Sequence, residues 1–251
     1  MFKLINLLVL LLSGVAIQVN GATWCELEAQ HCSGQEHIGC TPNSFPVGQC
    51  SNVVVVPMTE TLMNFIVNRH NQHRSTTATG GISHLPTASR MRQMSWDADL
   101  ATLAEIHVRH CNFAHDQCRA TTDFPYAGQN LAMSASSQPD TNQQNRLQMA
   151  IDSWFNEYQQ TTASNIDSIP SNINNIGHFT VMMRENNIRV GCAYITYNYS
   201  QSGTNWYAHM ITCNYADNNF VGSPVYTRGA ACSQCSSIGS TCSTIYSGLC
   251  V

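Results

Sequence analysis

The chain has 251 residues, of which 10% are charged, with 11 Lys and Arg set against 15 Asp and Glu. These few cations form no basic stripe, which excludes nucleic acid as a partner because phosphate binding depends on clustered cations. The length suits one domain of ordinary size with a small satellite.

The first 21 residues have the pattern of a cleaved signal peptide. Lys3 precedes the apolar run Leu7–Leu12, and Val19 and Gly21 stand at the −3 and −1 positions. The apolar run is shorter than the roughly 20 residues that a membrane-spanning helix requires, and no later stretch approaches that length. We therefore expect a secreted, extracellular chain that is soluble from about Ala22 onward and has no transmembrane segment.

All twelve cysteines follow this segment. An even number of cysteines in a secreted chain indicates complete pairing, and full pairing excludes a thiolate nucleophile. Four of them lie in residues 22–57, where Gly, Pro and Ser are frequent and neither a helical nor a strand period is sustained. We expect this segment to be a loop-rich N-terminal arm held by disulfides.

A first helix is expected after the arm. Thr59 is a suitable N-cap, and apolar residues follow it at helical spacing from Leu62 to Ile66. The polar run HNQHR (70–74) lies near the end of this helix. His70 and Arg74 share one helical face at i, i+4, and Asn71 can bond to backbone, so we interpret this run as structural.

Two further helices are expected. The second begins after Ser95 and ends near Cys111, with an apolar face typical of an amphipathic helix. The third spans Asn145 to Gln160, and its apolar residues recur at i, i+3, i+4, i+7, i+8 and i+11. Glu157 lies just off this apolar face, where it can point into the edge of a pocket or into water.

Three runs of strand-forming residues follow a polar stretch, namely Phe179–Met183, Val190–Tyr199 and Trp206–Tyr215. The last two flank the turn-forming sequence SQSGTN and predict an antiparallel hairpin, with Cys192 and Cys213 on opposite arms. Helices and a short antiparallel sheet in one unit predict an α+β domain over residues 58–226.

The composition changes beyond Thr227 to Gly, Ser and Cys, which defines a Cys-rich C-terminal tail over residues 227–251. The spacing of its four cysteines is also compatible with a zinc knuckle. We favour disulfides because the extracellular compartment is oxidising.

Six short motifs occur in the order found in one known family. They are HNQHR, CNFAHDQC (111–118), GQNLA (128–132), WFNEY (154–158), GHFT (177–180) and CNYADNNF (213–220). Together they resemble the CAP superfamily, and most of all the antigen 5 proteins of arthropods, over nearly all of the chain after the signal peptide. The resemblance implies a three-layer α-β-α sandwich with a large cleft on one face.

In similar proteins this cleft is lined by two histidines and two acidic residues. The matching positions here are His115, Gln129, Glu157 and His178, so an amide stands where relatives commonly have Glu. The resemblance also implies a pairing for the cysteines, of which the last two pairs follow the hinge of cysteine-rich secretory proteins. These pairs are Cys25 with Cys40, Cys32 with Cys118, Cys50 with Cys111, Cys192 with Cys213, Cys232 with Cys242, and Cys235 with Cys250.

Two neutral imidazoles and one carboxylate match the ligands of an open zinc site. We therefore expect His115 and His178 to be the ligands of any metal, and Gln129 to make zinc binding weaker than in relatives with both acids. No cofactor is required. The alternative is that both histidines are core residues that hydrogen-bond between the helix and sheet layers.

A secreted, non-enzymatic binding protein is the function that we expect. Its ligand is either a small hydrophobic molecule or an extracellular protein, as for a salivary, gut or seminal-fluid effector, and the chain is expected to be a monomer. The apolar faces Leu62–Ile66 and Leu147–Tyr158 either line a groove for such a ligand or belong to the core. A metal-dependent peptidase is the alternative, although neither GxSxG nor HExxH occurs.

One glycosylation sequon is present, Asn198-Tyr199-Ser200. The hairpin prediction places Asn198 at the hairpin tip, which is an exposed position where a glycan can be accommodated.

Overall fold

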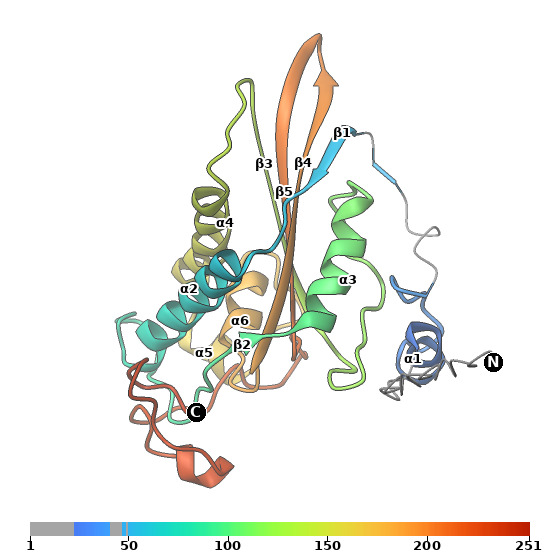
Figure 1. Ribbon diagram of the computed structural model, residues 1–251. Coiled ribbons are helices and arrows are strands. Elements are labelled where there is room, and N and C mark those ends of the chain that lie inside the picture. Colours follow the sequence, from blue (N-terminus) through green and yellow to red (C-terminus); the bar gives the residue numbers. More distant parts are fainter. Residues whose placement is uncertain (1–22, 41–46, 49) are drawn as a thin grey trace, which may run out of the picture.

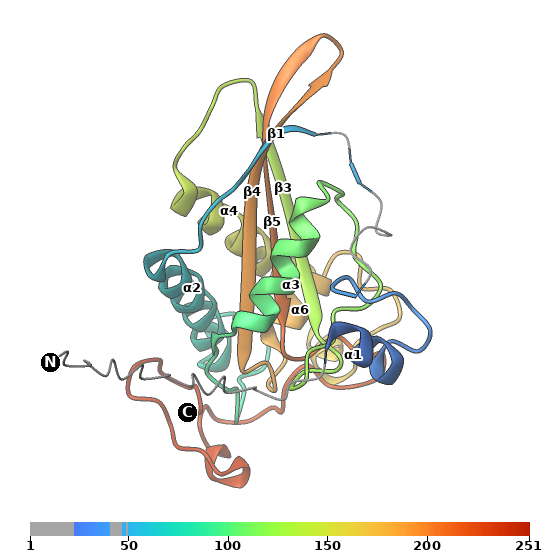
Figure 2. The same ribbon diagram turned by 45° about the vertical axis from the view of Figure 1, so that its right-hand side comes forward.

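A computed structural model describes residues 23–40, 47–48 and 50–251. The predicted signal peptide lies outside the described residues. The fold is α+β with three layers, in which one sheet separates α3 (Ala98–Arg109) from α2 (Glu60–Ala78), α4 (Gln143–Asn156) and α6 (Gly177–Met183) (Figures 1 and 2). The predicted sandwich is therefore observed.

The sheet has the order β1-β4-β5-β3, and a two-residue strand, β2 (Ser95–Trp96), pairs parallel with β4. Its strands are β1 (Ser51–Val55), β3 (Gly128–Ser136), β4 (Arg189–Gln201) and β5 (Thr204–Tyr215). The β4–β5 hairpin is confirmed, with Gln201 paired to Thr204. Its turn residues Ser202 and Gly203 have φ of 52° and 76°, as expected of a two-residue turn that follows the right-handed twist of the strands.

The three predicted helices are confirmed, with small shifts at their ends. Thr59 caps α2 by accepting the N–H of Leu62, and Asp97 caps α3 in the same way through Leu100. The predicted third helix is divided into α4 and a 3-10 turn, η1 (Glu157–Gln160). This division matters for function because Glu157 stands at the junction.

The strand predicted over Phe179–Met183 is wrong, since these residues belong to α6. All five are buried, so the segment has no polar face to reveal the 3.6-residue period of a helix. A short, fully apolar run is compatible with either structure, and the tertiary contacts of α6 decide between them.

The N-terminal arm contains a helix that its composition did not predict, α1 (Trp24–His31). Thr23 and Glu26 form a capping box at its start, and Leu27 is its one buried residue. A helix that buries so little has no apolar stripe, which explains why no helical period is visible in the sequence.

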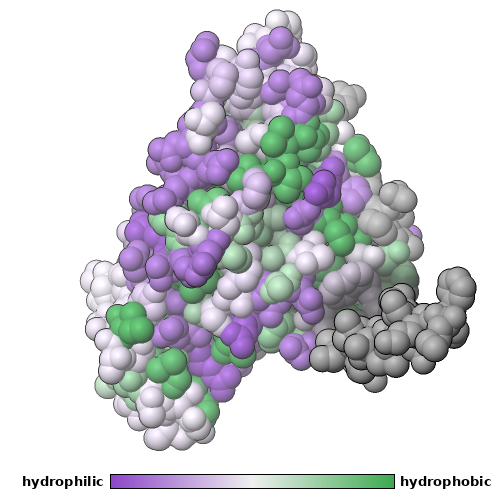
Figure 3. Space-filling view, in the orientation of Figure 1, coloured by the Kyte–Doolittle hydropathy of each residue, from purple (hydrophilic) through white to green (hydrophobic). Residues whose placement is uncertain are grey.

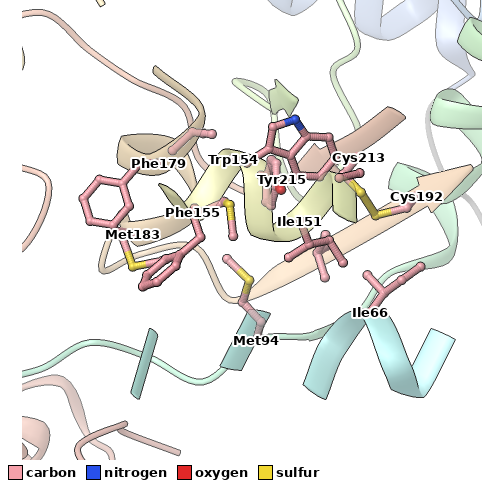
Figure 4. Close-up of a cluster of buried hydrophobic side chains, with 14 of the residues drawn as sticks. Ile66, Met94, Ile151, Trp154, Phe155, Phe179, Met183, Cys192, Cys213 and Tyr215 are labelled. Atoms are coloured by element: carbon pink, nitrogen blue, oxygen red, sulfur yellow. A yellow bond between two sulfur atoms is a disulfide. The ribbon is translucent and has the colours of Figure 1, made fainter. Parts of the chain in front are cut away.

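The main core lies between the sheet and the helices α2, α4 and α6, and Figure 4 shows part of it. Ile66, Ile151 and Phe179 are fully buried there. The indole N–H of Trp154 donates to the backbone oxygen of Leu131 over 3.0 Å, which ties α4 to β3. Hydrophilic residues predominate on the face drawn in Figure 3, and apolar areas appear near the edge strand β1 and at the lower left, over the C-terminal tail.

The HNQHR run is structural, as predicted. His70 is fully buried and bonds the backbone oxygen of Ile66 and the Tyr215 hydroxyl. The Arg74 guanidinium is fully buried as well, and donates to four backbone oxygens, which belong to Arg92, Met182, Arg184 and Glu185. These bonds join α2 to the end of α6 and to the segment that precedes β2.

Six disulfides are present, and they join the same pairs that the family resemblance implies. Cys32–Cys118 and Cys50–Cys111 connect the arm to both ends of the segment that carries His115. The tail contains a short 3-10 turn, η2 (Cys235–Ile238), and contributes buried Leu249 to the main core. No helix in the described ranges has the length and apolar character needed to cross a membrane.

Candidate functional site

A cleft of about 450 Å³ opens where β3 begins beside the first turn of α6. The loop after β5 closes its third side. Amides and imidazoles dominate the wall, and only two larger apolar side chains contribute to it. The lining residues are His115, Arg119, Gln129, Asn130, Ile173, Asn174, Gly177, His178, Val181, Asn218 and Asn219.

His115 enters the cleft from the loop after α3. Its Nδ1 lies 2.8 Å from the amide oxygen of Gln129. Because that oxygen can only accept, Nδ1 carries the proton, and Nε2 keeps a free lone pair. Burial lowers the pKa of His115 below its usual value, and the hydrogen bond to Gln129 opposes this shift only in part. The ring is therefore neutral at neutral pH.

Gln129 is held by a carboxylate that the sequence analysis did not identify. Its amide nitrogen donates to Asp116 over 2.7 Å and to Asn214 over 3.1 Å. Asp116 is only 5% exposed and pairs with Arg119 at 2.8 Å. A glutamate at position 129 would place two carboxylates in contact, so the amide suits this environment. The second carboxylate of the site is therefore Asp116, which contacts Gln129 and does not line the cleft itself.

His178 stands in the first turn of α6 and is oriented by Glu157. Its Nδ1 lies 2.7 Å from Glu157 Oε1, while Oε2 accepts the backbone N–H groups of His178 and Phe179 at 2.8 and 3.1 Å. Trp154 stacks on the imidazole with ring centroids 6.2 Å apart. This arrangement also leaves Nε2 of His178 without a hydrogen-bond partner among the described residues.

The structure brings together three of the four predicted cleft residues in one wall, namely His115, Gln129 and His178. Glu157 lies behind His178 and lines an adjoining shallow hollow that shares Asn174 with the cleft. The alternative of fully satisfied core histidines does not describe this geometry, because each ring is fixed through Nδ1 alone.

Two asparagines that the sequence analysis passed over hold α6 against the cleft. The amide nitrogen of Asn130 donates to the backbone oxygen of His178 over 3.2 Å, and that of Asn219 donates to Gly177 over 2.9 Å. The Oδ1 atom of each is buried and has no partner among the described residues. Asn130 lies in the motif GQNLA and Asn219 in the motif CNYADNNF. Membership of these motifs is the feature of the sequence that could have identified them as site residues.

The donor set suits a metal only in part. The Nε2 atoms of His115 and His178 are available as ligands, and each ring has the second-shell partner that metal-binding histidines usually have. Within the described ranges, however, no group of three His, Cys, Asp or Glu side chains is close enough to hold an ion. Two protein ligands are fewer than the three of a catalytic zinc site.

The apolar faces predicted as a possible groove belong to the core. Leu62 and Ile66 are 8% and 0% exposed, and Leu147, Ile151 and Trp154 are buried with them in one cluster. The two helix faces pack in that core and so do not form the wall of an open groove. The groove interpretation is therefore wrong, and ordinary core packing is confirmed for these residues.

The sequon asparagine does not lie at the hairpin tip. Asn198 pairs with Tyr207 inside the ladder, whereas the turn itself consists of Ser202 and Gly203. Its side chain is half-buried, and Ser51 of β1 bonds its backbone oxygen. The hairpin extends further than the apolar pattern indicated, and glycosylation of Asn198 stays a prediction.

Comparisons with known proteins agree with this fold. The family model described as the cysteine-rich secretory protein family, CAP, matches residues 67–215. Venom allergen-1 of Aedes albopictus is 34% identical, with 85% of this chain and 82% of that protein covered. Antigen 5 like allergen Cul n 1 of Culicoides nubeculosus is 39% identical, and the match covers 64% of this chain and 74% of that protein. The crystal structure of Na-ASP-1 is 27% identical with a TM-score of 0.62, and covers 82% of this chain and 51% of that one.

Proposed function

Because the chain belongs to the cysteine-rich secretory protein (CAP) family, we propose that it is a secreted, non-enzymatic protein that holds an extracellular ligand in the cleft between His115 and His178. One observation carries the proposal. Both imidazoles are fixed through Nδ1 and leave Nε2 available in the same cleft. Two oriented, unpaired acceptors on a disulfide-held frame are preorganised for binding.

The polar wall supports a polar ligand, or a polar part of an extracellular protein. The apolar helix faces that were considered for a hydrophobic ligand are occupied by the core. A small hydrophobic molecule therefore has less support than a partner that makes hydrogen bonds.

Binding without chemistry has more support than peptidase activity. Both oxygens of Glu157 are engaged by His178 and Phe179, so this carboxylate orients the imidazole and is not poised as a base. The residues that line the cleft include no Ser, Thr, Cys or Tyr. Release of a defined peptide by the purified protein, abolished by Glu157→Gln, would restore the peptidase alternative.

Zinc is compatible with the cleft as a weakly held ion. His115 and His178 would supply two ligands, and a bound zinc ion would act as a Lewis acid. Gln129 is committed to His115 and Asp116, so it does not complete the ligand set.

A thermal-shift screen tests the proposed function. The full secreted protein and its His115→Ala/His178→Ala double variant are incubated with fractionated small molecules and peptides from extracellular fluid. We expect at least one fraction to raise the Tm of the wild type and to leave that of the double variant unchanged. Equal shifts in both proteins, or chemical conversion of the active fraction seen by mass spectrometry, would contradict the proposal.

A further inference from the structure

We propose that the cleft selects a primary ammonium group, carried on a molecule or peptide side chain with an adjoining apolar part. This inference rests on the proposed function and specifies the ligand class of the same site. It follows from the balance of hydrogen-bond donors and acceptors in the wall, from the charges behind the wall, and from two exposed aromatic residues on the chain segments that lead to it.

Unpaired acceptors are concentrated in this cleft. Nε2 of His115 and Nε2 of His178 have no partner in the described part of the chain, because each ring is held through Nδ1. The Oδ1 atoms of Asn130 and Asn219 also lack partners among the described residues, and Asn130 is only 1% exposed. All four residues line the cleft. The two amide oxygens are buried, and buried acceptors are normally satisfied, so their occurrence beside two accessible imidazole nitrogens indicates a ligand that supplies donors.

The one cationic side chain in the wall is largely committed within the protein. Nε of Arg119 donates to the Asp116 carboxylate, Nη1 donates to the backbone oxygen of Ala127, and Nη2 donates to that of Asp116. These bonds use three of the five N–H groups of the guanidinium, and the ion pair with Asp116 compensates its charge. An anionic ligand could therefore use at most two N–H groups of Arg119, while its oxygens would repel the unpaired acceptors of the wall.

The charge behind the wall favours a cation. Asp116 and Arg119 form an ion pair, so their charges compensate each other. The Glu157 carboxylate stands behind His178 with no Lys or Arg side chain in its hydrogen-bond shell among the described residues. A cation at Nε2 of His178 would share the imidazole with this carboxylate, which strengthens the hydrogen bond.

An ammonium group suits this wall better than a metal ion. It carries three donors and no acceptor, and amide oxygens serve it as well as imidazole nitrogens do. A transition metal needs more nitrogen, sulfur or carboxylate ligands than the two histidines provide. A hydroxyl group brings one donor and no charge, so it would leave most of the acceptors unpaired.

Two exposed aromatic residues lie on the chain segments that lead to the cleft wall. Tyr126 and Phe220 form an edge-to-face pair with centroids 6.0 Å apart, and are 61% and 40% exposed. Phe220 directly follows the lining residue Asn219, and the Arg184 guanidinium already lies 5.6 Å from its ring centroid. Such rings can contact the apolar part of an amine and also attract its charge.

Calorimetric titration with three matched probes tests the inference. The probes are 2-phenylethylamine, 2-phenylethanol and (2-phenylethyl)trimethylammonium, each at pH 7.5 with a chelator present to exclude metal. We expect the primary amine to bind at least about tenfold more tightly than the alcohol, which lacks charge, and than the quaternary ammonium, which lacks donors. Equal affinity for all three probes, or no binding of the amine, would overturn the inference.

Variants then locate the site. His178→Ala and His115→Ala should each weaken binding of the amine by about tenfold. His84→Ala is the matched control, because His84 bonds the backbone oxygen of Tyr158 and does not line the cleft. Should His178→Ala fold poorly, the His115→Ala variant decides the result alone, because His115 is the more exposed of the two residues. Unchanged affinity in folded His115→Ala contradicts the inference.

The two proposals fail in different ways. If no probe binds but the thermal-shift screen finds a ligand that requires both histidines, the ammonium inference is wrong and the binding function stands. If the screen finds nothing that depends on the histidines and the amine does not bind, both are wrong.

Discussion

The Gln129 side chain makes two kinds of hydrogen bond, one as an acceptor and one as a donor. Its oxygen accepts from His115, and its nitrogen donates to Asp116 and Asn214. Only an amide has both functions, which a carboxylate would lose at neutral pH. Because Gln129 stands where relatives commonly have Glu, the His115 imidazole contacts a neutral amide. The nearest negative charge in this network is the Asp116 carboxylate, on the other side of Gln129.

Gln129→Glu should destabilise the protein by about 1–3 kcal/mol at pH 7.5, because two donors are lost and two carboxylates meet. Urea unfolding followed by fluorescence measures the change in the free energy of unfolding. Gln117→Glu is the control, since Gln117 is exposed and its oxygen accepts from the backbone N–H of Glu36, which a carboxylate can also do. Equal effects of the two substitutions would show that the network around Gln129 is unimportant.

Zinc binding can be measured on the same residues. Calorimetric titration of the wild type should show weak binding, and His115→Ala and His178→Ala should each reduce the affinity by about tenfold or more. The reason is that each imidazole supplies one of only two ligands. Identical titration curves for the three proteins would refute a zinc site in this cleft.

At the scale of elements, α6 depends on an acceptor from another helix. Glu157 follows the last residue of α4 and accepts two backbone N–H groups at the start of α6. These groups have no partner inside a helix, so a carboxylate there stabilises the helix and its dipole. The histidine and its helix are consequently oriented by the same side chain.

Glu157→Ala should reduce the hydrogen-exchange protection of Gly177–Met183 and lower the free energy of unfolding by about 1–3 kcal/mol. Exchange detected by mass spectrometry resolves this segment. Glu105→Ala is the control, because Glu105 makes only an exposed pair with Arg109, 45% and 55% exposed. Unaltered protection of α6 in Glu157→Ala would contradict the role assigned to Glu157.

Elements with a clear polar face were predictable from the sequence, and fully buried or barely buried elements were not. The stripe of α4 and the cap at Thr59 located two helices. By contrast, the last five residues of α6 are all buried and α1 buries only Leu27, so neither helix displays a helical period. Strand β3 was noticed only as the motif GQNLA, since its alternation is weak.

The sequence predicted the two histidines and Glu157 as site residues, because each of them lies in one of the family motifs. Asp116, Arg119, Asn130 and Asn219 were missed as site residues. Their roles depend on atoms that the fold brings together from β3, α6 and two loops. No local spacing records such contacts.

For the whole molecule, buried neutral histidines set the response to acid. Burial lowers the pKa of His70 to about 3. It also lowers the pKa values of four further buried histidines, which are His37, His73, His107 and His209. When the folded pKa is below the unfolded value near 6.5, the unfolded chain binds more protons, so stability is complete above that pH and falls as the pH decreases.

We expect the free energy of unfolding to fall between pH 6.5 and pH 4.5, with His70 alone contributing up to about 1.4 kcal/mol per pH unit. Guanidinium titrations at several pH values measure the slope. His70→Gln should reduce that slope by about this amount even if it lowers stability at every pH, whereas His84→Gln should not. An unchanged slope in His70→Gln would contradict this assignment.

The two disulfides that anchor the arm hold the His115 half of the cleft at Cys111 and Cys118. The core behind the Glu157–His178 half has a crosslink of its own, Cys192–Cys213, which joins β4 to β5. A reduced chain would therefore lose the anchors of the loop that carries His115. Under the proposed function, we expect ligand binding in the cleft to require an oxidised chain.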